Sequence, residues 1–371
     1  MQTAPLSSVS HRIHLGMPLP FNVRDAQQQL LLARGARIAD RVQLEALLGR
    51  GALVDIAELR SAADAAREAP RDALPRLWSE ALGRIADTLA RCDAQTFRAA
   101  LDDAAEPALA LVERDPDLAI FQILTQATSV DAAYGARRSL HAAITASLVA
   151  QRLAWAASEV EKVFKVALTM NVSMLELQGV LARQNQPPTR EQRAELRSHP
   201  MRSVQMLHAA GVRDEDWLRA VLQHHEVEDG SGYPAGRSEV CELASLVRRA
   251  DAYTSKLSAR STREALAADV AGRAMFMQDP GHPMTQALVK EFGIYPPGSH
   301  VRLACGALAV VVGRGPSITA PLVACLTGAD GRPLPAPKRI ATTDAAHAVV
   351  ALLPLRRDER AAQAAAVVMP D

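Results

Sequence analysis

The spacing of apolar residues divides this chain into helical and strand-forming stretches. Between about residues 60 and 115, apolar side chains recur at helical intervals, for example at Leu82, Ile85 and Leu89, which predicts amphipathic helices. From Pro296 onward the pattern changes to short β-type runs, VRLACGALAVVV, APLVACL and HAVVALL, separated by the turn segments GRGPS and GADGRP. We therefore expect a mainly α chain with a small β-rich appendage after the helices.

Local signals predict where two helices of the long central segment begin and end. In PTREQRAEL, Thr189 with a glutamine three residues later forms a capping-box pattern, which predicts a helix from there to about Ser198. Another helix is expected to begin near Asp214 or Asp216 and to lead to His224. The segment EDGSGYPAG that follows is dense in glycine, serine, aspartate and proline, and should end helical structure.

The opening of the chain contains two short apolar runs, a polar turn and one amphipathic helix, a pattern typical of a small α+β unit. We expect the following parts: a small α+β leader domain at 1–58, a helical connector at 59–118, a helical domain at 119–295, a β-rich C-terminal appendage at 296–355 and a tail at 356–371.

Composition excludes several classes of protein. The 371 residues carry a formal net charge of +1, without the basic excess that drives DNA binding. Four cysteines with no C-x-x-C pair indicate neither a disulfide framework nor a thiolate zinc site, which favours a reducing, cytoplasmic compartment. No signal-peptide pattern opens the chain, and its longest apolar runs are about half the roughly 20 residues that cross a bilayer. We expect no membrane span.

Histidines supply the candidate chemistry. His199, His224 and His225 lie beside turn signals of the helical domain, with His141 upstream and Asp251 downstream. Imidazole and carboxylate are common ligands of first-row metals, and facing helices can aim them into a bundle. Adjacent histidines on a helix differ by about 100° in direction. The pair at 224 and 225 therefore cannot point the same way.

The string HHEVEDGSGYP at 224–234 strongly resembles the signature of the HD-GYP family, a branch of the HD metal-dependent phosphohydrolases. RSHP upstream and RRADAY downstream agree with it, and the resemblance covers roughly residues 119–295. It implies an HD-type helical bundle, a place in cyclic di-GMP signalling and, in active members, metal-dependent hydrolysis of that nucleotide. MPLPFNVRD and LLLARG near the N-terminus look more loosely like a leader domain found on some relatives.

The resemblance also implies a ligand set. His141 matches the first helical ligand, His199 the histidine before proline, His224 and His225 the paired ligands, and Asp251 the late aspartate. With iron or manganese, these five positions would form most of the family's metal centre.

This sequence departs from the family at the His-Asp pair itself. Met170 and Asn171 stand there, and Arg137 stands where some relatives have a further glutamate. A thioether and an amide are poor ligands for iron or manganese, and a cation opposes metal binding. We expect a weakly or partly bound metal, or none, and little hydrolysis, because hydrolysis needs the metal to generate hydroxide and to clamp the phosphoryl oxygens.

The loop of the motif keeps its characteristic residues Gly230, Gly232, Tyr233 and Pro234. The glycines permit unusual backbone angles, and the tyrosine ring is suited to stacking on a guanine or on a partner side chain. The resemblance implies diguanylate cyclase domains as partners at this loop. Candidate phosphate-binding side chains are Arg248, Arg249 and Arg260.

The leading hypothesis is a degenerate HD-GYP-like protein that binds cyclic di-GMP or partner proteins with little hydrolysis. One alternative is an active phosphodiesterase with a reduced metal site built from His199, His224 and Asp251. The second is a structural scaffold without a nucleotide role, which predicts that the histidines do not gather around a pocket.

Overall fold

The computed structural model describes residues 3–13, 15–16, 19–59, 61–93, 95–126, 131–261 and 263–353. It divides the chain into two compact units, Met1–Glu68 and Ala69–Asp371, which are treated separately. The ten residues 59–68, counted with the connector above, thus fall in the N-terminal unit. The predicted tail, 356–371, lies outside the described residues.

The N-terminal unit is a small α+β fold. Its antiparallel sheet has the strand order β1-β4-β2-β3, and its core is built from Phe21, Val23, Ile38 and Val54, all fully buried. Asp40 caps the main helix by accepting a hydrogen bond from the Gln43 amide. The elements are β1 (Thr3–Pro5), η1 (Leu6–Arg12), β2 (Val23–Arg24), β3 (Leu30–Leu32), α1 (Arg41–Gly49), β4 (Leu53–Asp55), α2 (Ile56–Leu59) and α3 (Ala62–Glu68).

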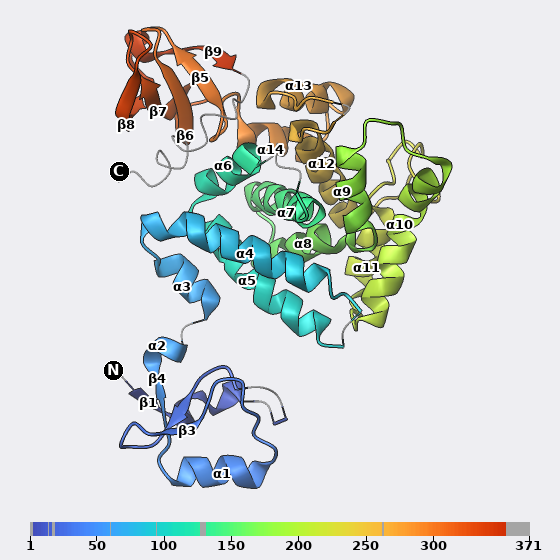
Figure 1. Ribbon diagram of the computed structural model, residues 1–371. Helices are drawn as coiled ribbons and strands as arrows, with labels where there is room; N and C mark the ends of the chain where they lie inside the picture. The colour runs from blue at the N-terminus through green and yellow to red at the C-terminus, as the bar shows by residue number, and fades with distance from the viewer. Residues whose placement is uncertain are drawn as a thin grey trace. The chain divides into compact units, whose positions relative to one another are not determined.

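The second unit is built around α7 (Tyr134–Arg152), whose residues 134–150 are all buried (Figure 1). It packs against α8 (Ala157–Thr169), α12 (Glu242–Leu257) and α14 (Pro283–Phe292). The predicted connector belongs to this bundle: α4 (Leu74–Leu89) packs on α5 (Phe97–Arg114) and on α7. α4 packs there because it has an apolar stripe, which includes Trp78, Ile85 and Leu89, and buries it in the bundle.

The remaining helices of the body are α6 (Pro116–Gln126), α9 (Leu175–Arg183), α10 (Arg190–Ala209), α11 (Glu215–Gln223) and α13 (Ala268–Gln278), with the 3-10 turns η2 (Arg71–Ala73) and η3 (Val172–Met174). The predicted capping box at Thr189 and the predicted helix start near Asp214 or Asp216 are both confirmed, with Asp214 as the N-cap of α11. The predicted end at Ser198 is wrong, because α10 continues through Pro200 to Ala209. No helix forms between His224 and Cys241, as expected.

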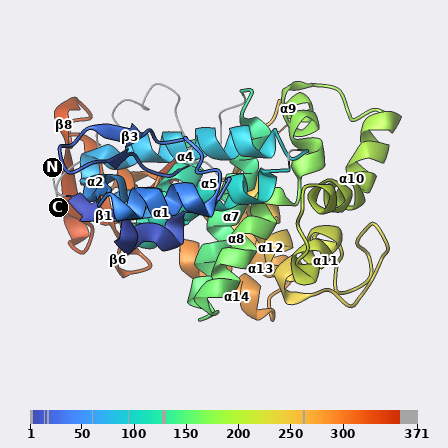
Figure 2. The same ribbon diagram turned by 90° about the horizontal axis from the view of Figure 1, so that it is seen from below.

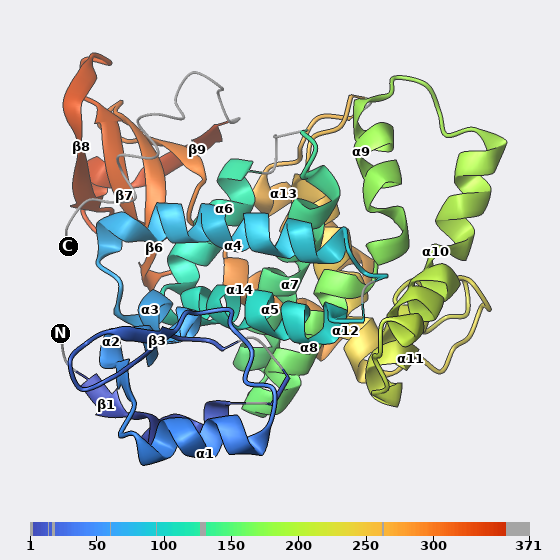
Figure 3. The same ribbon diagram turned by 60° about the horizontal axis from the view of Figure 1, so that its bottom comes forward.

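The β-rich appendage is a five-stranded antiparallel sheet of order β8-β7-β6-β5-β9. Arg314 joins it to the bundle through ion pairs with Asp117 (2.5 Å) and Glu291 (2.6 Å). The sheet and the α10–α11 pair lie at opposite ends of the unit (Figures 2 and 3). The elements are β5 (His300–Leu303), β6 (Leu308–Ser317), β7 (Ala320–Thr327), β8 (Pro333–Ala341), η4 (Ala345–His347) and β9 (Val349–Leu353). Among the described residues, no helix is long and apolar enough to cross a membrane.

Candidate metal centre and ligand pocket

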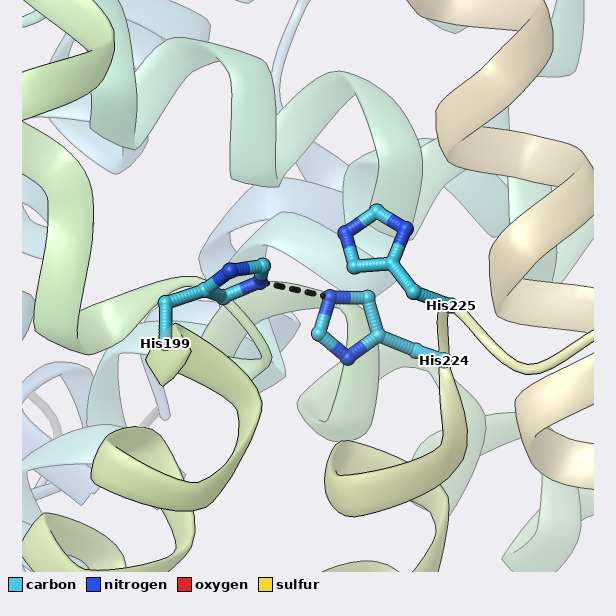
Figure 4. Close-up of side chains that lie close together, drawn as sticks. All are labelled: His199, His224 and His225. Atoms are coloured by element: carbon cyan, nitrogen blue, oxygen red, sulfur yellow. Dashed lines mark hydrogen bonds between the residues drawn. The ribbon is translucent and has the colours of Figure 1, made fainter. Parts of the chain in front are cut away.

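Three of the predicted histidines come together in the described structure. His199 projects from the middle of α10, His224 caps the end of α11, and His225 follows it (Figure 4). Each offers one ring nitrogen to a group whose members all lie within 4.8 Å of one another. His199 and His224 are fully buried and His225 is half-buried. The two adjacent histidines converge because the helix ends between them.

Backbone carbonyls fix the orientation of two rings. Pro200 has no amide hydrogen, so it leaves the carbonyl of Leu196 without its usual helical donor, and His199 Nδ1 donates to that oxygen at 2.6 Å. His224 Nδ1 donates in the same way to the carbonyl of Val221, also at 2.6 Å. A neutral histidine that carries its proton on Nδ1 presents a lone pair at Nε2. The two Nε2 atoms lie 3.1 Å apart.

The two facing Nε2 atoms show whether these residues fit a metal. Two neutral rings held this way face one another lone pair to lone pair, and a cation or a proton between them removes the repulsion. Imidazole nitrogens suit zinc, copper, iron and nickel, and carbonyl partners of the second ring nitrogen are typical of metal-binding histidines. The three histidines therefore fit one borderline cation.

Burial keeps these rings neutral. It lowers the pKa of His199, His224 and His225 to about 3 in each case, and the neighbouring imidazoles add to the effect. Near neutral pH all three rings are thus in the form that binds a metal.

The Gly-Tyr-Pro loop folds back over this cluster. The ring of Tyr233 stacks on His225, with 4.5 Å between centroids and 17° between planes, and its amide donates to the carbonyl of His225 at 3.1 Å. The buried carboxylate of Glu226 accepts hydrogen bonds from the amides of Ala235 (2.7 Å) and Arg237 (2.9 Å). The loop is a folded element that closes one side of the cluster.

Two glycines of the loop are required for different reasons. Gly230 has a φ of +77°, which favours glycine. Gly232 does not have a positive φ, but a Cβ there would lie 2.4 Å from the Val227 nitrogen and 2.5 Å from both Glu226 Cα and the carbonyl oxygen of His225. All three neighbours are backbone atoms, so the requirement is close approach of two chain segments.

Asp251 does not belong to the histidine group, although it lies on the neighbouring α12. Its Oδ1 accepts a hydrogen bond from Arg138 Nη2 at 2.6 Å. The other terminal nitrogen of Arg138, Nη1, contacts the hydroxyls of Thr254 (3.5 Å) on the same helix and of its C-cap residue Ser258 (3.3 Å). The side chains of Arg138 and Asp251 are 6% and 18% exposed, so this is a largely buried ion pair.

Comparisons with known proteins agree with this geometry. Residues 121–275 match the HD domain family model. The cyclic di-GMP phosphodiesterase PA4108 of Pseudomonas aeruginosa is 32% identical over 151 residues, which are 39% of this chain and 36% of that protein. The helical body is thus similar to HD domains, and in part to a cyclic di-GMP phosphodiesterase. Among solved structures, Bd1817, an HDG"Y"P protein from Bdellovibrio bacteriovorus, aligns with a TM-score of 0.48 and 16% identity over 78% of this chain and 98% of that one.

The positions that name the HD-GYP family lie at the end of α8 and are buried. Met170 is fully buried and Asn171 is 1% exposed. They lead into η3, where Ser173 donates to the carbonyl oxygen of His199 at 3.0 Å. Asn171 Oδ1 is buried without a hydrogen-bond partner among the described residues. The Asn171 amide is thus buried at the start of η3, and it carries no charge.

His141 is the fifth predicted ligand, and the structure does not bring it into the histidine group. It is buried on α7, and its Nε2 has no hydrogen-bond partner in the described part of the chain. Burial, with the charges of Arg138 and Arg137, lowers the pKa of His141 to about 3. Arg137 pairs with Asp131 at 2.6 Å. Two cations within one turn of His141 oppose a metal on that side of the helical body.

A cavity of about 500 Å³ opens beside the cluster. His225, Tyr233 and Asp251 form part of its wall. Of the three predicted phosphate-binding arginines, Arg260 lines it. Arg248 pairs with Glu228, while Arg249 is buried with Glu228, Ser245, Thr285 and Asp279 around it.

Arg138, Tyr134 and Gln178 are among the residues of this cavity that sequence reasoning missed. The hydroxyl of Tyr134 and Oε1 of Gln178 are buried without hydrogen-bond partners among the described residues. The sequence signal for Arg138 is its place one helical turn before His141, which puts both on one face of α7.

Proposed function

We propose that this chain binds cyclic di-GMP, or a closely related cyclic phosphodiester, in the cavity beside the histidine cluster and hydrolyses it little or not at all. The observation that carries the proposal is an ordered pocket with arginine, tyrosine and histidine side chains, next to a centre whose acidic ligands are missing or engaged. The ligand class comes from the Pseudomonas aeruginosa relative, a cyclic di-GMP phosphodiesterase.

The chain's own residues provide the contacts that such a ligand needs. Arg260 places a guanidinium at the cavity wall, where it can donate to phosphodiester oxygens in a bidentate manner. Tyr233 offers the edge of a ring that is already fixed by its stack on His225. The oxygens of Tyr134 and Gln178, which have no hydrogen-bond partner among the described residues, are available to the polar edge of a base or to a ribose hydroxyl.

Hydrolysis is the step that this site lacks. A cation bound by His199, His224 and His225 would polarise a phosphoryl oxygen and lower the pKa of a bound water. The family's bridging carboxylate is Asn171 here, and Asp251 is held by Arg138. Without an anionic bridge, nothing on the described side chains holds a second cation next to the first.

Binding is tested by isothermal titration of the full chain with cyclic di-GMP. Arg260→Ala should weaken binding by at least about tenfold, since a charge-assisted hydrogen bond is worth about 1.5–3 kcal/mol. Arg273→Ala is the matched control, because Arg273 is exposed on α13 and does not line the cavity. Loss of binding in both variants, or in neither, would reject Arg260 as a ligand contact.

The active-phosphodiesterase alternative is favoured by one observation, the preorganised histidine group. It predicts turnover that disappears in His224→Ala. The scaffold alternative predicts histidines that do not gather around a pocket, whereas His225 lies in the cavity wall. Docking of a diguanylate cyclase domain at Tyr233 stays a prediction, and one face of that ring is already occupied by His225.

A further inference from the structure

Arg138 and Asp251 form an ion pair that no sequence motif of the site predicts. Arg138 lies on α7 one turn before His141, and Asp251 lies on α12. Arg138 Nη2 reaches both the carboxylate oxygen Oδ1 of Asp251 (2.6 Å) and its backbone carbonyl oxygen (3.4 Å). The hydroxyls of Thr254 on α12 and of its C-cap Ser258 contact the other terminal nitrogen. The arginine is therefore fixed in place along one face of α12.

The ion pair lies in the wall of the cavity beside the histidine group, where Asp251 would otherwise be a metal ligand. Both side chains line the cavity of about 500 Å³ that contains His225 and Tyr233. Asp251 is close enough to act electrostatically on His199 and His224, yet its oxygens are not in the group of ligand atoms within 4.8 Å of one another. The carboxylate is turned toward the guanidinium instead.

Charge explains why this arrangement opposes a cation at Asp251. A buried carboxylate needs a positive partner, and Arg138 already supplies one through its hydrogen-bonded guanidinium. A metal ion at the same oxygen would have to displace the guanidinium or lie beside it, against like-charge repulsion. The second arginine of the turn, Arg137, adds to the positive charge on this side.

We propose that Arg138 acts as an internal cation that takes the place of a metal ion at Asp251, and so limits the centre to one cation on His199, His224 and His225. The site is then a three-imidazole site without a carboxylate. Such a donor set favours Zn²⁺ over the harder Mn²⁺, which prefers oxygen ligands. The inference concerns metal binding alone and does not depend on nucleotide binding.

Metal titrations of the full chain test it. The wild-type chain should bind one Zn²⁺ and no second ion, and Mn²⁺ only weakly, as measured by calorimetry and by metal analysis after dialysis. Asp251→Asn should leave Zn²⁺ affinity within about threefold of wild type, because Asp251 is not a ligand. Were Asp251 a ligand, the same change would cost at least about tenfold, the lower end of what even outer-shell changes cost.

Removing the arginine should have the opposite effect on the harder ion. Arg138→Gln releases Asp251 and should raise Mn²⁺ affinity by at least about tenfold, and the double change Arg138→Gln with Asp251→Asn should cancel that gain. Arg137→Gln is the matched control, because Arg137 is the adjacent buried arginine but pairs with Asp131, and it should leave Mn²⁺ affinity within about threefold.

Two results would overturn the proposal. One is a wild-type chain that holds two metal ions. The other is a folded Arg138→Gln variant that gains no Mn²⁺ affinity. If Arg138→Gln fails to fold, the wild-type stoichiometry and the Zn²⁺ affinity of Asp251→Asn decide the matter without it.

Discussion

Gly232 is the residue whose replacement should disturb the loop most directly. A methyl group at Gly232 would stand 2.4 Å from the Val227 nitrogen and 2.5 Å from the carbonyl oxygen of His225, well inside contact distance. These atoms belong to the backbone on which the loop folds, so no side-chain rotation can relieve the clash. Gly232→Ala must push the loop away from the histidine cluster.

The magnitude follows from what the displacement breaks. Overpacking that forces a backbone shift costs about 1–3 kcal/mol. The shift also strains the hydrogen bonds from the amides of Ala235 and Arg237 to the buried carboxylate of Glu226, and each hydrogen bond to a charged group is worth about 1.5–3 kcal/mol. We expect a loss of about 3 kcal/mol in the free energy of unfolding, with the stack of Tyr233 on His225 disrupted.

Urea denaturation followed by circular dichroism measures this loss, and the proton chemical shifts of His225 report the stack. Gly272→Ala is the matched control, because Gly272 lies in α13 with no atom within 4 Å of its added Cβ. It should be neutral or slightly stabilising, since alanine favours a helix over glycine by about 1 kcal/mol. A Gly232→Ala variant as stable as wild type, with unchanged histidine shifts, would refute the close-approach argument.

Three further predictions concern the histidines, the His-Asp positions and the appendage. His141, His199, His224 and His225 have pKa values near 3 in the folded chain against 6.5 as the reference. Below about pH 6.5 the unfolded chain therefore binds more protons than the folded chain. As the pH falls from about 6 to 4, each histidine should lower the free energy of unfolding by roughly 1 kcal/mol per pH unit. Urea denaturation across that range checks the slope, and a flat profile would contradict it. Met170→His with Asn171→Asp should raise Mn²⁺ uptake by at least about tenfold by calorimetry, because it adds an imidazole and an anionic bridge; unchanged uptake would mean that these positions do not face the centre. Arg314→Gln should lower the unfolding free energy by about 1–2 kcal/mol, since it breaks partly screened pairs with Asp117 and Glu291, and thermal unfolding that matches wild type would show the network to be energetically neutral.

Local signals predicted those parts of the fold that depend on short-range chemistry. The capping box at Thr189 and the helix start near Asp214 formed as expected, because each cap needs only a side chain and an amide three residues away. The end of α10 was mispredicted at Pro200. Proline removes one backbone donor, and the ring of His199 replaces it at the Leu196 carbonyl, a compensation that no residue propensity contains.

The candidate site was predicted only as far as its motif extends. The three histidines of the group lie in two short sequence motifs, RSHP and HHEVEDGSGYP, which made them recognisable as candidates. The place of Arg138 one turn before His141 does not distinguish it from Arg137, which lies one residue earlier and points in another direction around α7. One meets Asp131 and the other meets Asp251, which is 113 residues away in the chain. Contacts of that range depend on how helices pack, and so does the separation of His141 from the cluster.

The most direct test of the central claim is one incubation of the Zn²⁺-loaded chain in excess over cyclic di-GMP, in which bound nucleotide and linear product are both quantified. We expect the nucleotide to be bound and recovered intact, with product at the level of a protein-free control. Product that accumulates with the wild type and disappears with His224→Ala would contradict the account and show that the three-histidine centre hydrolyses its ligand.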